Sequence, residues 1–120
     1  MPAHSPSTSD APGGAERAAF QRHAPAFARY TEDVLFGDVW QRPGLSPRDR
    51  SLITVAALVA LNRVGQLPFH LQRAVDNGLS PDELAEAITH LAFYAGWPCA
   101  ASAVPLLGAL TPTPATATDS

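Results

Sequence analysis

Residues 46–70 of this 120-residue chain read SPRDRSLITVAALVALNRVGQLPFH, and this stretch decides the fold. It opens with a helix-start signal, since Ser46 is a suitable N-cap and Pro47 suits the first helical position. Between residues 52 and 61 only Thr54 is polar. A helix that is apolar on all sides is normally buried at the centre of a small helical protein. The stretch therefore predicts a buried central helix and an all-α fold.

Helix signals continue on both sides of this stretch and predict a bundle of about five to six helices. Ser80 is followed by Pro81 and, three residues after the cap, by Glu83, which is a full capping signature. Asn77-Gly78 is a C-terminal stop, because glycine adopts the left-handed conformation without strain. The expected helices are residues 16–28, interrupted by Pro25; 30–40, capped by Thr31; 46–62; 67–77; 80–95; and 99–110, kinked or ended early by Pro105.

The two ends of the chain differ in composition from its middle. Residues 1–15 and 111–120 are rich in Pro, Ser, Thr, Gly and Ala and have almost no large apolar side chains to bury. Such segments do not gain enough from burial to offset their conformational entropy. We therefore expect two disordered tails around one helical domain, residues 16–110.

Composition also excludes several kinds of partner and site. The net charge is −3, lysine is absent and no run of basic residues occurs, so no nucleic-acid partner is expected. Cys99 is the only cysteine, which excludes an internal disulfide and a CxxC pair. The longest strictly apolar run, residues 55–61, is far too short to cross a bilayer, and no signal-peptide pattern opens the chain. We therefore expect a cytoplasmic protein with no membrane partner.

His70, at the end of the deciding stretch, is the leading candidate for chemistry. It lies between Leu67 and Ala74, at the edge of an apolar helix face. Partial desolvation at such a place lowers the pKa of an imidazole and keeps a neutral base available near pH 7. That base suits general acid–base catalysis on a small molecule. The alternative is a core histidine that is hydrogen-bonded to a backbone carbonyl.

Glu86, His90 and Tyr94 form a second stripe, because they are spaced four residues apart on one predicted helix. A carboxylate at this spacing can orient the imidazole, so His90 is a candidate second catalytic residue. The alternative is an exposed or inter-subunit polar stripe. No HxxxH motif or Cys/His cluster with ligand spacing occurs in the sequence, so no metal site is predicted.

Aromatic and basic side chains supply candidates for substrate binding. The candidate pocket walls for a flat or cyclic ligand are Phe69, Phe93, Tyr94 and Trp97, although such residues are also common in cores and interfaces. Arg50 is a candidate partner for a substrate carboxylate, or else it pairs with a neighbouring acid. Cys99 has no partner histidine or second cysteine nearby in the sequence, and we interpret it as structural.

Two long runs carry a family resemblance: FGDVWQRPGLSPRDRSLITVAALVAL at residues 36–61 and QLPFHLQRAVDNGLSPDELAEAITHLAFYAGWPCAASAV at residues 66–104. Together they resemble the carboxymuconolactone decarboxylase family, which belongs with the alkylhydroperoxidase-like helical proteins. The resemblance implies an alkylhydroperoxidase-like all-α bundle and a homo-oligomer, commonly a trimer or a hexamer, with sites near subunit contacts. We expect no cofactor.

The resemblance also separates two branches of chemistry. The peroxidase branch carries CxxCxxxH. Here His70 matches its histidine, but Arg63 and Gln66 stand at the cysteine positions and the branch's glutamate falls at about Ser51. Thiol peroxidase chemistry therefore lacks its nucleophile. The decarboxylase branch keeps the histidine and usually has an acidic residue where Gln66 stands. Gln66 can hydrogen-bond a carbonyl but cannot transfer a proton.

The sequence therefore predicts a cofactor-free acid–base enzyme of the decarboxylase type, acting on a small cyclic carboxylate or lactone. In this hypothesis His70 and His90 are catalytic. The substrate-binding residues are Gln66, Tyr94, Trp97, Phe69 and Arg50. A non-catalytic binding or scaffold oligomer is the alternative, and an alkylhydroperoxidase-type antioxidant is a more remote one.

Overall fold

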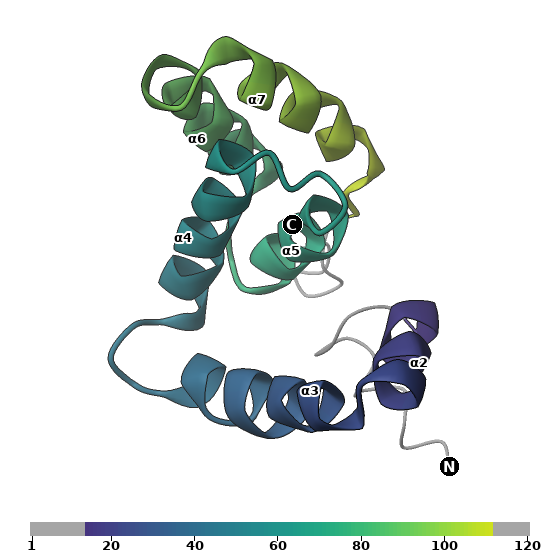
Figure 1. Ribbon diagram of the computed structural model, residues 1–120. Helices are drawn as coiled ribbons and strands as arrows, with labels where there is room; N and C mark the ends of the chain where they lie inside the picture. Colours follow the sequence, from purple (N-terminus) through teal and green to yellow (C-terminus); the bar gives the residue numbers. More distant parts are fainter. Residues whose placement is uncertain (1–13, 112–120) are drawn as a thin grey trace. The chain divides into compact units, whose positions relative to one another are not determined.

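The computed structural model describes residues 14–111 (Figure 1), and every regular element in this range is helical. The described residues divide into two compact units, residues 14–45 and residues 46–111. The elements are α2 (Gly14–His23), α3 (Pro25–Tyr30), the π-helix η1 (Thr31–Phe36), the 3-10 helix η2 (Val39–Gln41), α4 (Pro47–Ala60), α5 (Leu67–Asp76), α6 (Pro81–Tyr94), α7 (Trp97–Ala103) and the 3-10 helix η3 (Val104–Ala109). The prediction of an all-α fold is confirmed.

In the first unit, Pro25 divides the expected helix 16–28 into α2 and α3. A proline is tolerated at the start of a helix but not in its interior. The first helix therefore ends before Ala24, and a new helix, α3, begins with Pro25 in its first position. Phe20 and Phe27 meet across this break with ring centroids 4.9 Å apart, edge to face. Arg17 donates to Glu32 at 3.0 Å through Nε, which ties α2 to η1.

The expected helix 30–40 is wrong in its type and in its start. Thr31 is not a cap. Its hydroxyl donates to the Phe27 carbonyl at 2.8 Å within a continuous helix, and the chain then widens into the π-helix η1. The wide turn ends at Gly37, where only glycine fits. A Cβ at this position would lie 2.7 Å from the carbonyl oxygens of Asp33 and Glu32. Phe36 and Trp40 are buried, and their rings stack at 6.1 Å.

The second unit begins with α4 and α5, which form a helical hairpin. The side chain of Ser46 accepts a hydrogen bond from the Asp49 N–H at 3.0 Å, as the sequence predicts for an N-cap. After α4, Asn62 has a positive φ of 57°, which turns the chain toward α5. At the other end of the hairpin, Asn77 Nδ2 donates to the buried Ser51 hydroxyl at 3.0 Å. Polar pairing at that end therefore fixes α5 against the start of α4.

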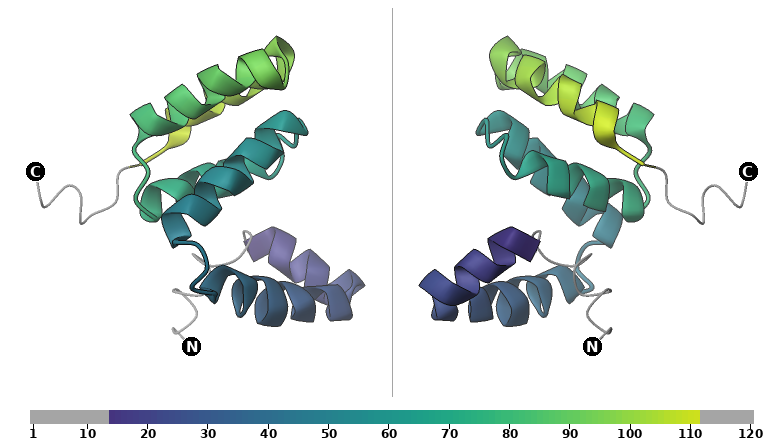
Figure 2. Two further views of the ribbon diagram at one scale, coloured as in Figure 1. Left: turned by 90° about the vertical axis from the view of Figure 1, so that its left-hand side faces the viewer. Right: turned by 90° about the vertical axis from the view of Figure 1, so that its right-hand side faces the viewer.

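The second pair of helices, α6 and α7, packs on this hairpin, and the two pairs form two layers in Figure 2. The predicted capping box is confirmed, since the Glu83 N–H donates to Ser80 Oγ at 3.0 Å and the Ser80 N–H donates to Glu83 Oε1 at 2.9 Å. Gly96 has a φ of +118°, which reverses the chain, and α7 then starts two residues before the expected Cys99. Pro105 is the reason that η3 replaces the α-helix from Val104 onward.

The core of the second unit follows the predicted apolar stripes. The largest apolar side chains under 2% exposed come from α4, α5 and α6, and they are Val55, Val59, Leu67, Leu71, Leu84 and Ile88. Helix α5 buries one face completely, whereas α4 does not. Ile53 is 56% exposed and Leu61 is 64% exposed. The expectation that α4 is buried on all sides is therefore wrong within a single chain, because α5, α6 and α7 cover only part of its circumference.

The ends of the described range also refine the sequence-based boundaries. Gly14 and Ala15 are helical, so the expected N-terminal tail is two residues too long. Thr111 is fixed to α5, because its N–H donates to Gln72 Oε1 at 3.0 Å and its carbonyl accepts from Gln72 Nε2 at 2.9 Å. The rest of both expected tails lies outside the described residues. Within residues 14–111, no helix is long and apolar enough to cross a membrane.

We predict that Ile88→Ala lowers the free energy of unfolding by about 2–5 kcal/mol, because it removes a fully buried side chain from the centre of the core. Ile53→Ala removes the same atoms from a side chain that is 56% exposed, and we expect a change of about 0.5 kcal/mol. Urea unfolding followed by far-UV circular dichroism measures both values. Equal losses in the two variants would contradict the described core.

Candidate active site

His70 lies in the first turns of α5, between the buried residues Leu67 and Leu71. Its side chain is half-buried, and its ring meets Phe69 edge to face with centroids 4.9 Å apart. The backbone N–H of His70 donates to the Gln66 carbonyl at 3.4 Å, so the residue is fixed within the helix. The sequence-based placement at the edge of an apolar face is therefore confirmed.

The environment of His70 changes its protonation. Burial, which is the larger cause, and the positive charge of Arg73 together lower the pKa of His70 to about 4. The imidazole is therefore neutral at pH 7. In this form one ring nitrogen donates a hydrogen bond and the other accepts a proton.

Two further polar residues share the His70 side of α5. Gln66 precedes His70 by four residues, at the N-cap position of the helix, and its side chain is exposed. Arg73 follows His70 by three residues, and its charge acts on the imidazole. Residues three and four apart are neighbours on a helix surface. An amide, an imidazole and a guanidinium thus follow one another along one side of α5, and we call Gln66, His70 and Arg73 the α5 polar row.

Arg73 is the residue of this row that the sequence-based reasoning missed. The signal was available, because a cation three residues after a candidate base lies on the same helix face. Arg50, the cation proposed from the sequence, instead lies in the first turn of α4, next to Ser51. The hydrogen bond from Asn77 to Ser51 places that end of α4 at the C-terminal end of α5, seven residues beyond His70. Arg50 and His70 thus lie at different positions along the length of the α4–α5 hairpin.

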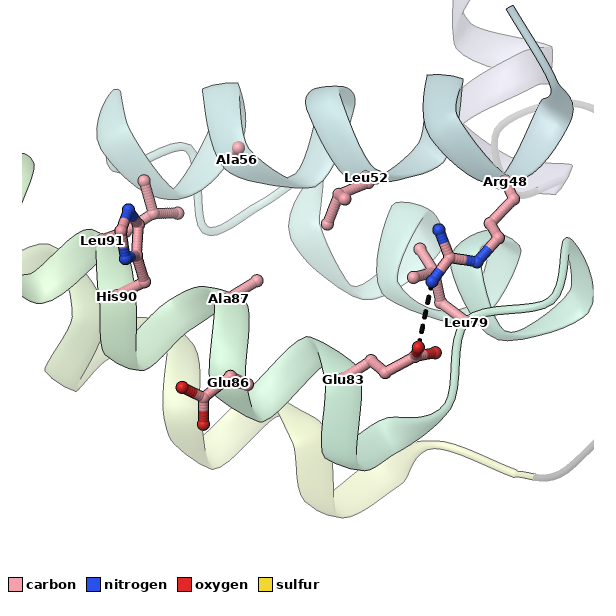
Figure 3. Close-up of a pocket in the computed structure, with 9 residues that line it drawn as sticks. All are labelled: Arg48, Leu52, Ala56, Leu79, Glu83, Glu86, Ala87, His90 and Leu91. Carbon is pink, nitrogen blue, oxygen red and sulfur yellow. Dashed lines mark hydrogen bonds and ion pairs between the residues drawn. The ribbon is translucent and has the colours of Figure 1, made fainter.

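His90 lies elsewhere, in a groove of about 450 Å³ between α4 and α6 (Figure 3). The groove is apolar at its centre and has charged or polar residues at its rim. Its lining residues are Arg48, Leu52, Ala56, Leu79, Glu83, Glu86, Ala87, His90 and Leu91. His70 is not part of this lining. The two candidate catalytic histidines are therefore on different surfaces of the second unit.

An ion pair crosses one end of this groove. Arg48 donates to the Glu83 carboxylate at 2.9 Å (Figure 3). Arg48 also lies 3.5 Å from Asp49. Hydrogen bonding from the Ser80 backbone lowers the pKa of Glu83, and the Arg48 charge contributes in the same direction. Both partners are exposed enough for the pair to be screened by solvent, so its role is to fix side-chain positions. Sequence reasoning identified Glu83 as a cap and did not identify Arg48.

The predicted aromatic pocket wall is on the surface. Tyr94 is 81% exposed, Phe93 is 77% exposed and Trp97 is 67% exposed. Tyr94 stacks on His90 with centroids 4.9 Å apart, and Phe93 meets Trp97 edge to face at 6.3 Å. Of the proposed aromatic wall, Phe69 contacts His70, whereas Tyr94 and Trp97 belong to the surface that carries His90.

The remaining reactive groups do not form a site of their own. The Cys99 thiol is half-buried and 3.7 Å from the Ala60 carbonyl oxygen, in the layer between α7 and α4. From residue 14 to residue 111, no three His, Cys, Asp or Glu side chains group in a way that could hold a metal ion.

Comparison with known proteins supplies the family. The family model described as the carboxymuconolactone decarboxylase family matches residues 25–109, which includes α5 and both layers of the second unit. The chain belongs to this family. The resemblance found in the sequence is therefore confirmed.

Two curated relatives are similar to parts of this chain. A 4-carboxymuconolactone decarboxylase from Acinetobacter baylyi is 42% identical over 78 residues, which are 65% of this chain and 58% of that protein. A nitrosuccinic acid decarboxylase from Metarhizium robertsii is 36% identical over 81 residues, which are 64% of this chain and 57% of that protein. The match thus spans somewhat more than half the length of each relative. Both names support a carboxy-lyase-like family.

We predict that the His70 imidazole stays neutral until the pH falls to about 4. Because its pKa is lower in the folded than in the unfolded chain, its contribution to stability is complete above about pH 6.5 and is lost as the pH falls toward 4. Arg73→Gln removes the nearby charge and should move the midpoint upward, whereas Arg73→Lys keeps the charge and the low midpoint. Imidazole NMR shifts measure the midpoint. A wild-type midpoint near 6.5 would contradict the burial of His70.

Proposed function

We propose that this protein is a decarboxylase that acts on a small cyclic carboxylate or lactone, with His70 as its acid–base group. The single observation that carries the proposal is the α5 polar row. It combines a half-buried imidazole that is neutral at pH 7 with a hydrogen-bonding amide and a cation on one side of one helix. The family and the names of both relatives supply the type of reaction.

The names of the two relatives indicate which substrate groups a site of this kind must bind. Carboxymuconolactone and nitrosuccinic acid each contain more than one oxygen-rich group: a carboxylate that can leave and a lactone or nitro group that can accept electrons. Such substrates need a cation to bind carboxylate and a hydrogen-bond donor at the electron-accepting oxygen. In our proposal Arg73 binds a carboxylate, and the side-chain amide of Gln66 donates to the lactone oxygen.

The proposed reaction starts with the substrate carboxylate ionised. The bond between this carboxylate and the ring carbon breaks, carbon dioxide leaves, and the electron pair moves through the ring to the lactone oxygen. A proton must then be added to the ring system. Because a bound anion favours the imidazolium form, substrate binding lets His70 take up a proton from water. His70 then gives that proton to carbon and returns to its neutral form.

Most of the other candidate residues keep their predicted roles within this proposal, but Arg50 does not, because it lies at the other end of the hairpin from His70. Phe69 packs beside His70 and shields the imidazole. Tyr94, Trp97 and His90 contribute to the site through a subunit contact. We expect the protein to act in the cytoplasm as a homotrimer or hexamer. Its own side chains would supply the acid–base chemistry.

We predict that His70→Ala lowers the turnover of 4-carboxymuconolactone by about 10²–10⁴-fold, because it removes the proton carrier. Carbon dioxide release by the purified full chain measures the rate. His23→Ala, at the end of α2, is the matched control and should keep wild-type turnover. Full turnover by the His70 variant would contradict its role. Binding without any turnover by the wild type would favour the non-catalytic alternative.

We predict that Arg73→Gln raises KM for the same substrate by roughly 10–100-fold, because a charge-assisted hydrogen bond to a carboxylate is lost. Arg22→Gln removes an equal charge from the last turn of α2 and should leave KM unchanged. Steady-state kinetics of carbon dioxide release separate KM from kcat. An unchanged KM in the Arg73 variant would exclude Arg73 from substrate binding.

A further inference from the structure

The link between α4 and α5 (Figure 1) fixes the backbone of a third arginine of the second unit, Arg63. Its N–H donates to the Leu58 carbonyl at 2.8 Å, and the Asn62 N–H donates to the Val59 carbonyl at 3.0 Å. Asn62 has a left-handed φ of 57°. These two hydrogen bonds around a left-handed residue form a Schellman motif, which ends α4. Arg63 directly follows the left-handed residue of that motif.

Arginine is an unexpected residue at this position. The residue that follows the left-handed one commonly packs an apolar side chain on the last turn of its own helix. Arg63 is exposed instead. Among residues 14–111, no hydrogen bond or ion pair engages its guanidinium. The local structure therefore holds a cation in place without using its charge.

The same link brings Arg63 to the end of α5 at which the α5 polar row begins. The Gln66 N–H donates to the Arg63 carbonyl at 3.2 Å, and the His70 N–H donates to the Gln66 carbonyl at 3.4 Å. A turn closed by the first kind of bond keeps its end Cα atoms within about 7 Å, and one turn of helix adds roughly 6 Å. The Cα atoms of Arg63 and His70 are therefore at most about 13 Å apart. A small ligand beside His70 is thus within reach of the long Arg63 side chain.

This end of the α4–α5 hairpin has no carboxylate of its own. The chain has no acidic residue between Asp49, in the first turn of α4, and Asp76, the last residue of α5. Both of these acids lie at the opposite end of the hairpin, where Asn77 donates to Ser51. The acidic first turn of α6 is held at that opposite end too, by its ion pair with the start of α4. The positive charge at the link is therefore available to an anionic ligand.

We propose that Arg63 is a specificity-determining residue of the His70 site and binds a second carboxylate of the substrate, the one that stays in the product. This role rests on the decarboxylation proposed above. Arg63 then supplies a cation on the Gln66 side of the imidazole, and Arg73 supplies one on the other side. A ring that carries two carboxylates pairs with both cations, whereas a ring with one carboxylate leaves one cation without an anion.

Arg63 takes the place that the sequence suggested for Arg50. Both side chains are guanidinium groups, which bind a carboxylate through two parallel hydrogen bonds. Arg50 lies in the first turn of α4, at the far end of the hairpin from the polar row. Arg63 lies at the near end, one closed turn before Gln66. Position along the hairpin therefore decides between the two arginines.

The first test measures binding without turnover, so its result does not depend on decarboxylation. Wild type, Arg63→Gln and Arg63→Lys are titrated with isophthalate, a flat ring with two carboxylates, and with benzoate, which has one. NMR signals of the His70 imidazole report binding beside that residue. Arg63→Gln should lower the isophthalate affinity about tenfold and leave the benzoate affinity unchanged, because only the second carboxylate loses its partner. Arg63→Lys keeps the charge without the planar fork and should give an intermediate isophthalate affinity.

The second test measures carbon dioxide release from 4-carboxymuconolactone by the full chain. Arg63→Gln should raise KM about tenfold and leave kcat unchanged, because the residue binds a group that does not react. Arg22→Gln, in the last turn of α2, is the matched control and should change neither KM nor the isophthalate affinity. Far-UV circular dichroism checks the fold, and the Schellman motif uses only backbone groups of residue 63.

Three results would overturn the proposal. Wild type could bind isophthalate no more tightly than benzoate, or Arg63→Gln could keep the full isophthalate affinity. An equal loss of both ligands in Arg63→Gln would show that the residue does not select the second carboxylate. A wild type without turnover that still needs Arg63 for isophthalate binding would contradict the proposed reaction and support Arg63 as the carboxylate-binding residue.

Discussion

The packing of α4 against α5 and α6 is the contact on which the second unit depends. Val55 and Val59 of α4 are fully buried, and they belong to one apolar cluster with Leu71 of α5 and Ile88 of α6. Because this cluster contains no charged side chain, its stability comes from the removal of apolar surface from water. The polar groups at its margin, such as the Asn77–Ser51 pair, then fix the position of α5 along α4.

The same packing gives His70 its chemical character. An imidazole on an isolated α5 would be solvated and would titrate near its ordinary pKa. In the folded unit the core draws one face of α5 inward, and His70 at the edge of that face becomes half-buried. Burial together with the Arg73 charge keeps it neutral. The apolar core and the candidate chemistry therefore have one physical cause.

Two surfaces of the second unit differ in their chemistry. The α5 polar row carries a base, an amide and a cation, which suit a small anionic substrate. The exposed face of α6 that carries Glu86, His90 and Tyr94 instead borders the apolar groove of Figure 3. The apolar face of α4 that includes Ile53 is exposed in the single chain.

Sequence reasoning identified residues well where the cause is local and less well where the cause is distant. His70 and the stripe at Glu86, His90 and Tyr94 were recognisable from helical spacing, whereas Gln66 was identified only through the family resemblance. Arg73 was missed although the same spacing pointed to it. The pairing of Arg48 with Glu83 had no local signal, because the two residues are 35 positions apart and meet only when α4 packs on α6.

The sequence by itself determined where most helices begin and end. The caps at Ser46 and Ser80, the restart at Pro25 and the reversal at Gly78 each depend on hydrogen bonds or φ preferences within a few residues. Only the tertiary structure decided which side chains are desolvated. The pKa of His70, the exposed face of α4 and the groove beside His90 depend on which helix surfaces cover one another, and covering is a property of packed helices rather than of any single segment.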